Sequence, residues 1–134
     1  ENPIFGAAIR RCHAFPVKRG ASDRGAIKAA VAVLKEGRIL GLFPEGTRSK
    51  TGELQKAEAG IALIAAMTGA PIVPVAILNT HRIFANGGLI PQLRIMYGEP
   101  ITFHGDRKSK ESLDAFSEEI MGHIARMKEE LAQK

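Results

Sequence analysis

The 134-residue sequence contains no tryptophan, one tyrosine and a single cysteine, Cys12. A lone cysteine has no partner within the chain, which excludes a disulfide scaffold. Aromatic residues are few and no basic stretch is interleaved with them, so the stacking platform of a nucleic-acid-binding protein is absent and no nucleic-acid partner is expected. The 14 glycines and 7 prolines are scattered and no block of sequence repeats, which excludes collagen-like and low-complexity chains.

The remaining composition is that of a globular protein. Hydrophobic residues make up 45% of the chain and charged residues 25%, which predicts one domain with a single core over residues 1–134. Lys and Arg number 19 against 14 Asp and Glu, a net charge of +5. This excess favours an anionic partner such as a phosphate, a nucleic acid or a lipid surface. The four histidines and one cysteine lack the spacing of zinc ligands, so no metal is expected.

Residues 59–78 carry no charged side chain over 20 positions, which is the length of a membrane-spanning helix. Gly69, Ala70 and Pro71 interrupt this run and Pro74 follows. The pattern therefore favours a buried helix that ends at Gly69, followed by a strand. A proline in a central strand removes a donor from the hydrogen-bond ladder, so we expect a bulge or a sheet edge at Pro74.

Apolar periodicity and capping residues predict the other elements. Helices are expected over residues 3–11, 22–37, 56–68 and from Ser109 onward, with Ser22 and Ser109 as N-caps; strands are expected over 14–17, 39–43, 71–78 and 93–97. Strand and helix alternate through the first 80 residues. This order predicts an α/β fold with a mostly parallel or mixed sheet covered by helices.

A polar block, residues 43–49 (FPEGTRS), follows the predicted buried strand 39–43. Ligands of open α/β sheets bind beyond the carboxyl ends of strands. Gly46 would let the backbone approach an anion closely, and the planar guanidinium of Arg48 matches phosphate oxygens. Lys18 and Arg19 follow another predicted strand, so we expect the two basic corners to converge on one anion. The alternative is a pair of ordinary surface turns.

Residues 43–49 resemble the third signature block of the glycerolipid acyltransferases, the 1-acylglycerol-3-phosphate acyltransferase family. Residues 15–20 are similar to the second block, 70–77 to the fourth and 97–101 to a downstream Gly-x-Pro-Ile stretch, in the same order and spacing. The resemblance spans about residues 2–103 and implies a glycerol-3-phosphate acyltransferase-like fold. It implies that the substrate phosphate is bound by Lys18, Arg19, Glu45, Gly46, Thr47 and Arg48. It also implies a cleft for the acyl donor or acceptor, lined by Val73, Pro74 and Val75.

The reaction implied by this resemblance is transfer of a fatty acyl group from an acyl thioester to the free hydroxyl of 1-acylglycerol 3-phosphate (lysophosphatidate), giving phosphatidate. The acyl donor would be acyl-CoA or an acyl carrier protein, and no bound cofactor is implied. Because the acceptor is an amphiphile, the resemblance also implies work at a membrane surface, on the cytoplasmic face of the cell membrane. Attachment would be peripheral or through a segment outside this chain.

The first block of the family, His-x-x-x-x-Asp, supplies the catalytic base, and this spacing occurs nowhere in the chain. His81 has Asn86, not an aspartate, at the fifth position, and His13 stands in a predicted strand. We therefore expect the pair upstream of Asn2, assign no catalytic residue here, and expect the chain alone to be inactive. Two alternatives stay open: an acyltransferase for glycerol 3-phosphate or another lysolipid, and a non-catalytic module that binds an anion or lipid surface.

Overall fold

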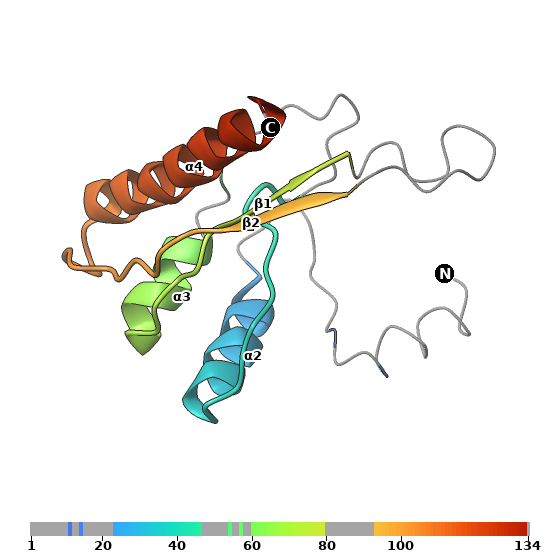
Figure 1. Cartoon of the computed structure of the whole chain (residues 1–134). Coiled ribbons are helices and arrows are strands. Elements are labelled where there is room, and N and C mark those ends of the chain that lie inside the picture. Colours follow the sequence, from blue (N-terminus) through green and yellow to red (C-terminus); the bar gives the residue numbers. More distant parts are fainter. Residues whose placement is uncertain are drawn as a thin grey trace. The chain divides into compact units, whose positions relative to one another are not determined.

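The structure is a computed structural model. It describes Arg11, Ala14, Leu54, Ala57 and residues 23–46, 60–79 and 93–133. The chain divides into two compact units, Glu1–Leu40 and Gly41–Lys134. The first contains helix α2, and the second contains α3, β1, β2 and α4 (Figure 1). The expectation of one acyltransferase domain over residues 1–134 stays a prediction.

Helix α2 (Arg24–Lys35) begins and ends on residues suited to each terminus. Its N-cap is Asp23, whose carboxylate accepts a hydrogen bond from the Ala26 N–H at 3.1 Å. The sequence-based choice of Ser22 was one residue early, since Asp23, also a favoured N-cap residue, occupies the position. The helix ends at Lys35, close to the predicted end, and Gly37, which has a φ of +72°, follows the C-cap residue Glu36. There the N–H groups of residues 37 and 38 donate to carbonyls of the last turn, an arrangement that a glycine accommodates without strain.

Helix α3 (Gly60–Thr68) starts later than the predicted residue 56 and ends where expected. Gly69 has a φ of +69° and its N–H donates to the carbonyl of Ala65 at 2.8 Å. The chain then turns and becomes strand β1 (Val75–Leu78). The uncharged run 59–78 is therefore a helix, a turn and a strand. In the described part of the chain, no helix combines the length and the apolar character needed to cross a membrane.

Strands β1 and β2 (Arg94–Tyr97) form an antiparallel pair in which Val75 lies opposite Tyr97. A separate bridge joins Ile72 to Ile101. Two residues separate the paired positions on the β1 side, and three separate them on the β2 side, so one extra residue bulges from the β2 side. Pro74 lies at this irregularity and its carbonyl accepts the Gly98 N–H at 2.9 Å. The ladder is therefore irregular at Pro74, as expected, but the extra residue lies in the opposite segment, residues 98–100.

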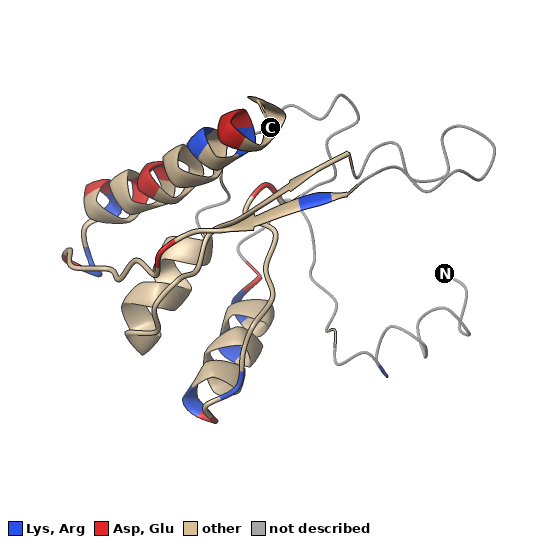
Figure 2. Cartoon of the chain, in the orientation of Figure 1, with Lys and Arg blue, Asp and Glu red and all other residues tan. Residues whose placement is uncertain are grey.

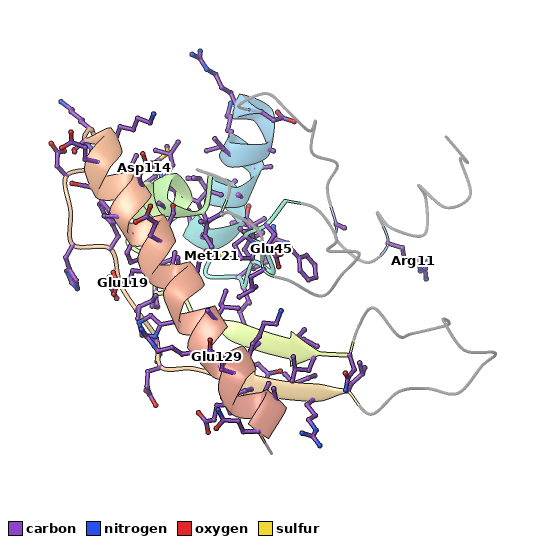
Figure 3. The ribbon with its side chains drawn as sticks, turned by 90° about the horizontal axis from the view of Figure 1, so that it is seen from above. Arg11, Glu45, Asp114, Glu119, Met121 and Glu129 are labelled. Carbon is purple, nitrogen blue, oxygen red and sulfur yellow. The ribbon has the colours of Figure 1, made fainter. Side chains whose placement is uncertain are left out.

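Helix α4 (Lys110–Gln133) is the longest described element. Ser109 caps it as predicted, since its hydroxyl accepts the Ser112 N–H at 3.2 Å. Apolar residues at steps of three and four are buried along the helix, at Phe116, Ile120, Ile124, Met127 and Leu131. Glu119 and Met121 point to opposite sides of α4 (Figure 3), so the helix has a solvent side and a core side.

Two apolar clusters lie along α4. The first joins it to α3 through Ala62, Ala65, Phe116, Ile120 and Ile124, and the ring of Phe103 meets Phe116 edge-on with centroids 5.3 Å apart. The second lies under the sheet, where Ala76 of β1 packs with Met127 and Leu131. The first half of α4 thus packs on α3, and its second half covers one face of the sheet.

Two sequence-based expectations about the sheet differ from the structure. Residues 39–43 form no strand, and Ile39 and Phe43 are 95% and 81% exposed. A strand needs a hydrogen-bonded neighbour, and none of the described residues pairs with this segment. The sheet of the described residues is also antiparallel rather than mostly parallel. Exposure alternates along β2, with Ile95 and Tyr97 exposed on the face away from α4.

Candidate functional site

The block at residues 43–49 begins with a tight turn. The N–H of Gly46 donates to the carbonyl of Phe43 at 3.2 Å. Pro44 stands at the second position, where its fixed φ favours a turn, and Gly46 at the fourth. Gly46 has a φ of +62°, in the left-handed region that side chains disfavour. Both residues therefore have a local structural reason to occupy these positions.

The two candidate residues in this turn have different surroundings. Gly46 is exposed and its N–H is already engaged within the turn. An anion bound here would therefore meet the side chains and backbone that follow Gly46. Glu45 lies in the same loop (Figure 3), is partly buried and interacts with a neighbouring group. A partly buried carboxylate can orient a guanidinium, which is the supporting role predicted for it.

The remaining predicted phosphate ligands, Lys18, Arg19, Thr47 and Arg48, lie outside the described residues, as does His13. The convergence of Arg19 and Arg48 on one anion therefore stays a prediction. Among the described residues that follow the block, Leu54 packs against the cluster formed by α3 and α4. The turn is thus followed within eight residues by an anchor in the core.

The three predicted cleft residues differ in accessibility. Pro74 is fully buried, Val75 is partly buried and Val73 is 47% exposed. A side chain can contact a substrate only where it is accessible, so Val73 is the best placed of the three. The cleft itself stays a prediction, and Pro74 has a clear packing role.

The structure adds Gly98, whose importance the sequence did not explain. A Cβ atom at this position would lie 2.9 Å from the Pro74 ring and 3.0 Å from the Met127 sulfur. The absence of a side chain lets the two strands approach beside α4. The pairing of Ile72 with Ile101, and of Val75 with Tyr97, brings residues 70–77 and 97–101 together. Both segments had been singled out only as sequence blocks.

The described residues contain no group of three or more His, Cys, Asp or Glu side chains that could hold a metal ion.

Comparison with known proteins decides the family. A family model described as Acyltransferase matches residues 1–78, more than half of the chain. The chain belongs to the acyltransferase family. The resemblance found in the signature blocks is therefore confirmed. A solved acyltransferase structure confirms the α/β fold class. That structure is the 1-acyl-sn-glycerophosphate acyltransferase PlsC from Thermotoga maritima, which superposes with a TM-score of 0.62 at 31% identity over 81% of this chain.

Two curated members of the family align with nearly the whole of this 134-residue chain. A 1-acyl-sn-glycerol-3-phosphate acyltransferase of Bacillus subtilis is 33% identical over 99% of it. The enzyme of the same name from Streptococcus pneumoniae is 34% identical over 98%. The chain covers 66% and 49% of these two relatives and 46% of the Thermotoga protein. It thus spans no more than about two thirds of the length of these relatives.

Proposed function

We propose that the protein transfers a fatty acyl group from an acyl thioester to the free hydroxyl of 1-acylglycerol 3-phosphate, giving phosphatidate in phospholipid biosynthesis. The supporting observation is the block at residues 43–49, with its glycine-dependent turn at 43–46. It lies in a chain that aligns along 99% of its length with a relative named for this reaction.

The reaction needs three kinds of group. A base removes the proton of the acceptor hydroxyl, whose oxygen then attacks the thioester carbonyl carbon. The carbon–sulfur bond breaks and the thiol leaves with a proton, while donors stabilise the developing oxyanion. This chain would supply the anion-binding part: Lys18, Arg19, Thr47 and Arg48 would bind the phosphate, with Glu45 orienting a guanidinium. The base would come from outside these 134 residues, and no bound cofactor is needed.

The proposal extends to the donor and the place of reaction. Acyl-CoA or an acyl carrier protein would bring the acyl group as a thioester. Since lysophosphatidate and phosphatidate are amphiphiles, the protein would work at the cytoplasmic face of the cell membrane. The net charge of +5 suits an anionic substrate and an anionic lipid surface.

Replacing Arg48 by alanine in the full-length enzyme tests the phosphate role. Loss of a charge-assisted contact should weaken binding by about 1.5–3 kcal/mol, which raises the KM for lysophosphatidate roughly ten- to hundredfold. Arg107→Ala, at an exposed arginine in the turn before α4, is the matched control and should leave KM unchanged. An Arg48→Ala enzyme with the wild-type KM would remove Arg48 from the site.

A parallel assay with glycerol 3-phosphate separates the acceptors. Turnover of lysophosphatidate but not of glycerol 3-phosphate is expected. The reverse result would replace the proposed acceptor. Binding of lysophosphatidate without turnover of either acceptor would favour a non-catalytic lipid-binding module.

A further inference from the structure

Three basic residues lie along one side of helix α2. Arg24, Lys28 and Lys35 are all exposed. At 3.6 residues per turn they fall within about 40° of one another around the helix axis and span about 16 Å along it. The helix contains no acidic residue; Asp23 precedes it and Glu36 follows it. Figure 2 shows these basic positions spaced along α2, with acidic colour only beyond its ends.

The exposed surface of α4 is different. It carries charges of both signs (Figure 2): the basic residues Lys110 and Arg126, and the acidic residues Glu111, Asp114, Glu118, Glu119, Glu129 and Glu130. Mixed charges of this kind are typical of a solvated helix surface, where neighbours offset one another. The three basic residues of α2, here called the basic line, have no such offset within their helix. A single-sign line of charge attracts a partner of the opposite sign.

We propose that the basic line of α2 is a docking surface for an acidic protein surface, namely that of the carrier protein which delivers the acyl thioester. The rest of the exposed sector of α2 consists of Gly25 and Ala32. Small neighbours leave the three charged side chains accessible to a flat partner such as the side of a helix. This inference rests on the proposed acyl transfer. It adds that the acyl donor is a carrier protein and that the carrier protein binds at α2.

A lipid surface fits the basic line less well. Helices that lie in a membrane interface combine basic residues with large apolar residues that insert into it. None of the exposed large hydrophobic side chains of the described residues is on α2. Recruitment to anionic lipids by charge alone typically uses about four to eight basic residues, more than the three on this line.

Binding and kinetics of a charge-reversed variant test the proposal. In the full-length protein, Arg24→Glu, Lys28→Glu and Lys35→Glu are combined. The probes are an acidic acyl carrier protein without an acyl group, its long-chain acyl thioester, the matching acyl-CoA, and phosphatidylglycerol vesicles. The variant should raise the Kd for the carrier protein, and lower kcat/KM with the acyl carrier, by about tenfold or more. Its kcat/KM with acyl-CoA and its vesicle binding should change less than about twofold.

The control variant combines Arg107→Glu, Lys108→Glu and Lys110→Glu, which changes the net charge equally at exposed positions. Equal losses in both variants would reduce the effect to net charge and overturn the proposal. So would an unchanged carrier Kd, or a loss confined to vesicle binding. A glutamine version of the three α2 changes, checked by circular dichroism, separates a docking loss from loss of the helix. Because carrier binding is measured directly, an absence of acyl transfer in the wild type would contradict the proposed function without deciding the docking.

Discussion

The apolar segments 39–43 and 75–78 have the same sequence pattern and reach different structures. Both are short runs of apolar residues that predict a buried strand. Residues 75–78 are β1, with Ala76 fully buried under α4. Residues 39–43 form no strand, Ile39 is 95% exposed, and the boundary between the two compact units falls at Leu40.

The difference lies in the neighbours of each segment rather than in the segment itself. β1 pairs with β2 through backbone hydrogen bonds and packs on α4 through Ala76. Among the described residues, no strand pairs with residues 39–43, and the side chains of Ile39 and Phe43 are largely exposed. A short run of apolar residues is therefore compatible with a buried strand. Whether it forms one depends on a neighbouring strand that pairs with it and on a helix that packs over it.

A buried charge should give the largest contrast between these segments. Ala76→Asp places a carboxylate among Met127 and Leu131, with no described partner for it, and should lower the free energy of unfolding by about 3–5 kcal/mol. Ile39→Asp, at a side chain 95% exposed, should change it by less than about 0.5 kcal/mol. Urea unfolding of the 134-residue chain measures both. Equal losses would mean that segment 39–43 is also covered.

Replacing one glycine in each region by alanine compares how tightly the two regions are packed. The Cβ of Gly98→Ala would lie 2.9 Å from the rigid, buried ring of Pro74, so the chain should lose about 1–3 kcal/mol of stability. At Gly41 nothing lies within 4 Å of the added atom. Gly41→Ala should therefore be neutral or stabilise by about 0.4–1 kcal/mol, because it restricts the unfolded chain. Tolerance of Gly98→Ala would show that the close approach of the strands is not required.

Local chemistry made much of the fold predictable. The end of α2 near Gly37, the end of α3 at Gly69 and the capping of α4 by Ser109 all depend on residues adjacent to the element. An irregular ladder at Pro74 followed from the missing donor of a proline, although the extra residue lies on the β2 side. What the sequence did not reveal is long-range: the antiparallel pairing of β1 with β2, and the exposure of residues 39–43.

The same division applies to the site. The turn at 43–46 was predictable because Pro44 and Gly46 determine it locally. The packing of Gly98 on Pro74 was not, because it depends on contact between strands distant in sequence. Convergence of Arg19 with Arg48 would be a long-range arrangement of the same kind, and it stays a prediction. The identity of the block was carried by the pattern of residues 43–49, which the family match supports.

Two arginines, one opposite the end of β1 and one just before segment 39–43, give the smallest contrast. Arg94, at the start of β2, donates from Nη1 to the Leu131 carbonyl at 3.0 Å. That carbonyl lies in the last turn of α4, where no helical N–H is available to it. Arg94→Met keeps the apolar stem and loses this bond, so stability should fall by about 1 kcal/mol. Arg38 precedes the other segment and pairs with Glu36 at 2.7 Å, with both side chains more than half exposed.

Because solvent screens the pair of Arg38 with Glu36, Arg38→Met should change the free energy of unfolding by less than about 0.5 kcal/mol. Urea unfolding at low and high salt measures both arginine variants. The Arg94 effect should persist at high salt in large part, since a partly buried hydrogen bond is screened less than an exposed ion pair. A salt-sensitive loss at Arg38 as large as that at Arg94 would contradict the distinction drawn between the two segments, because it would mean that the chain before residue 39 is held as firmly as the paired sheet.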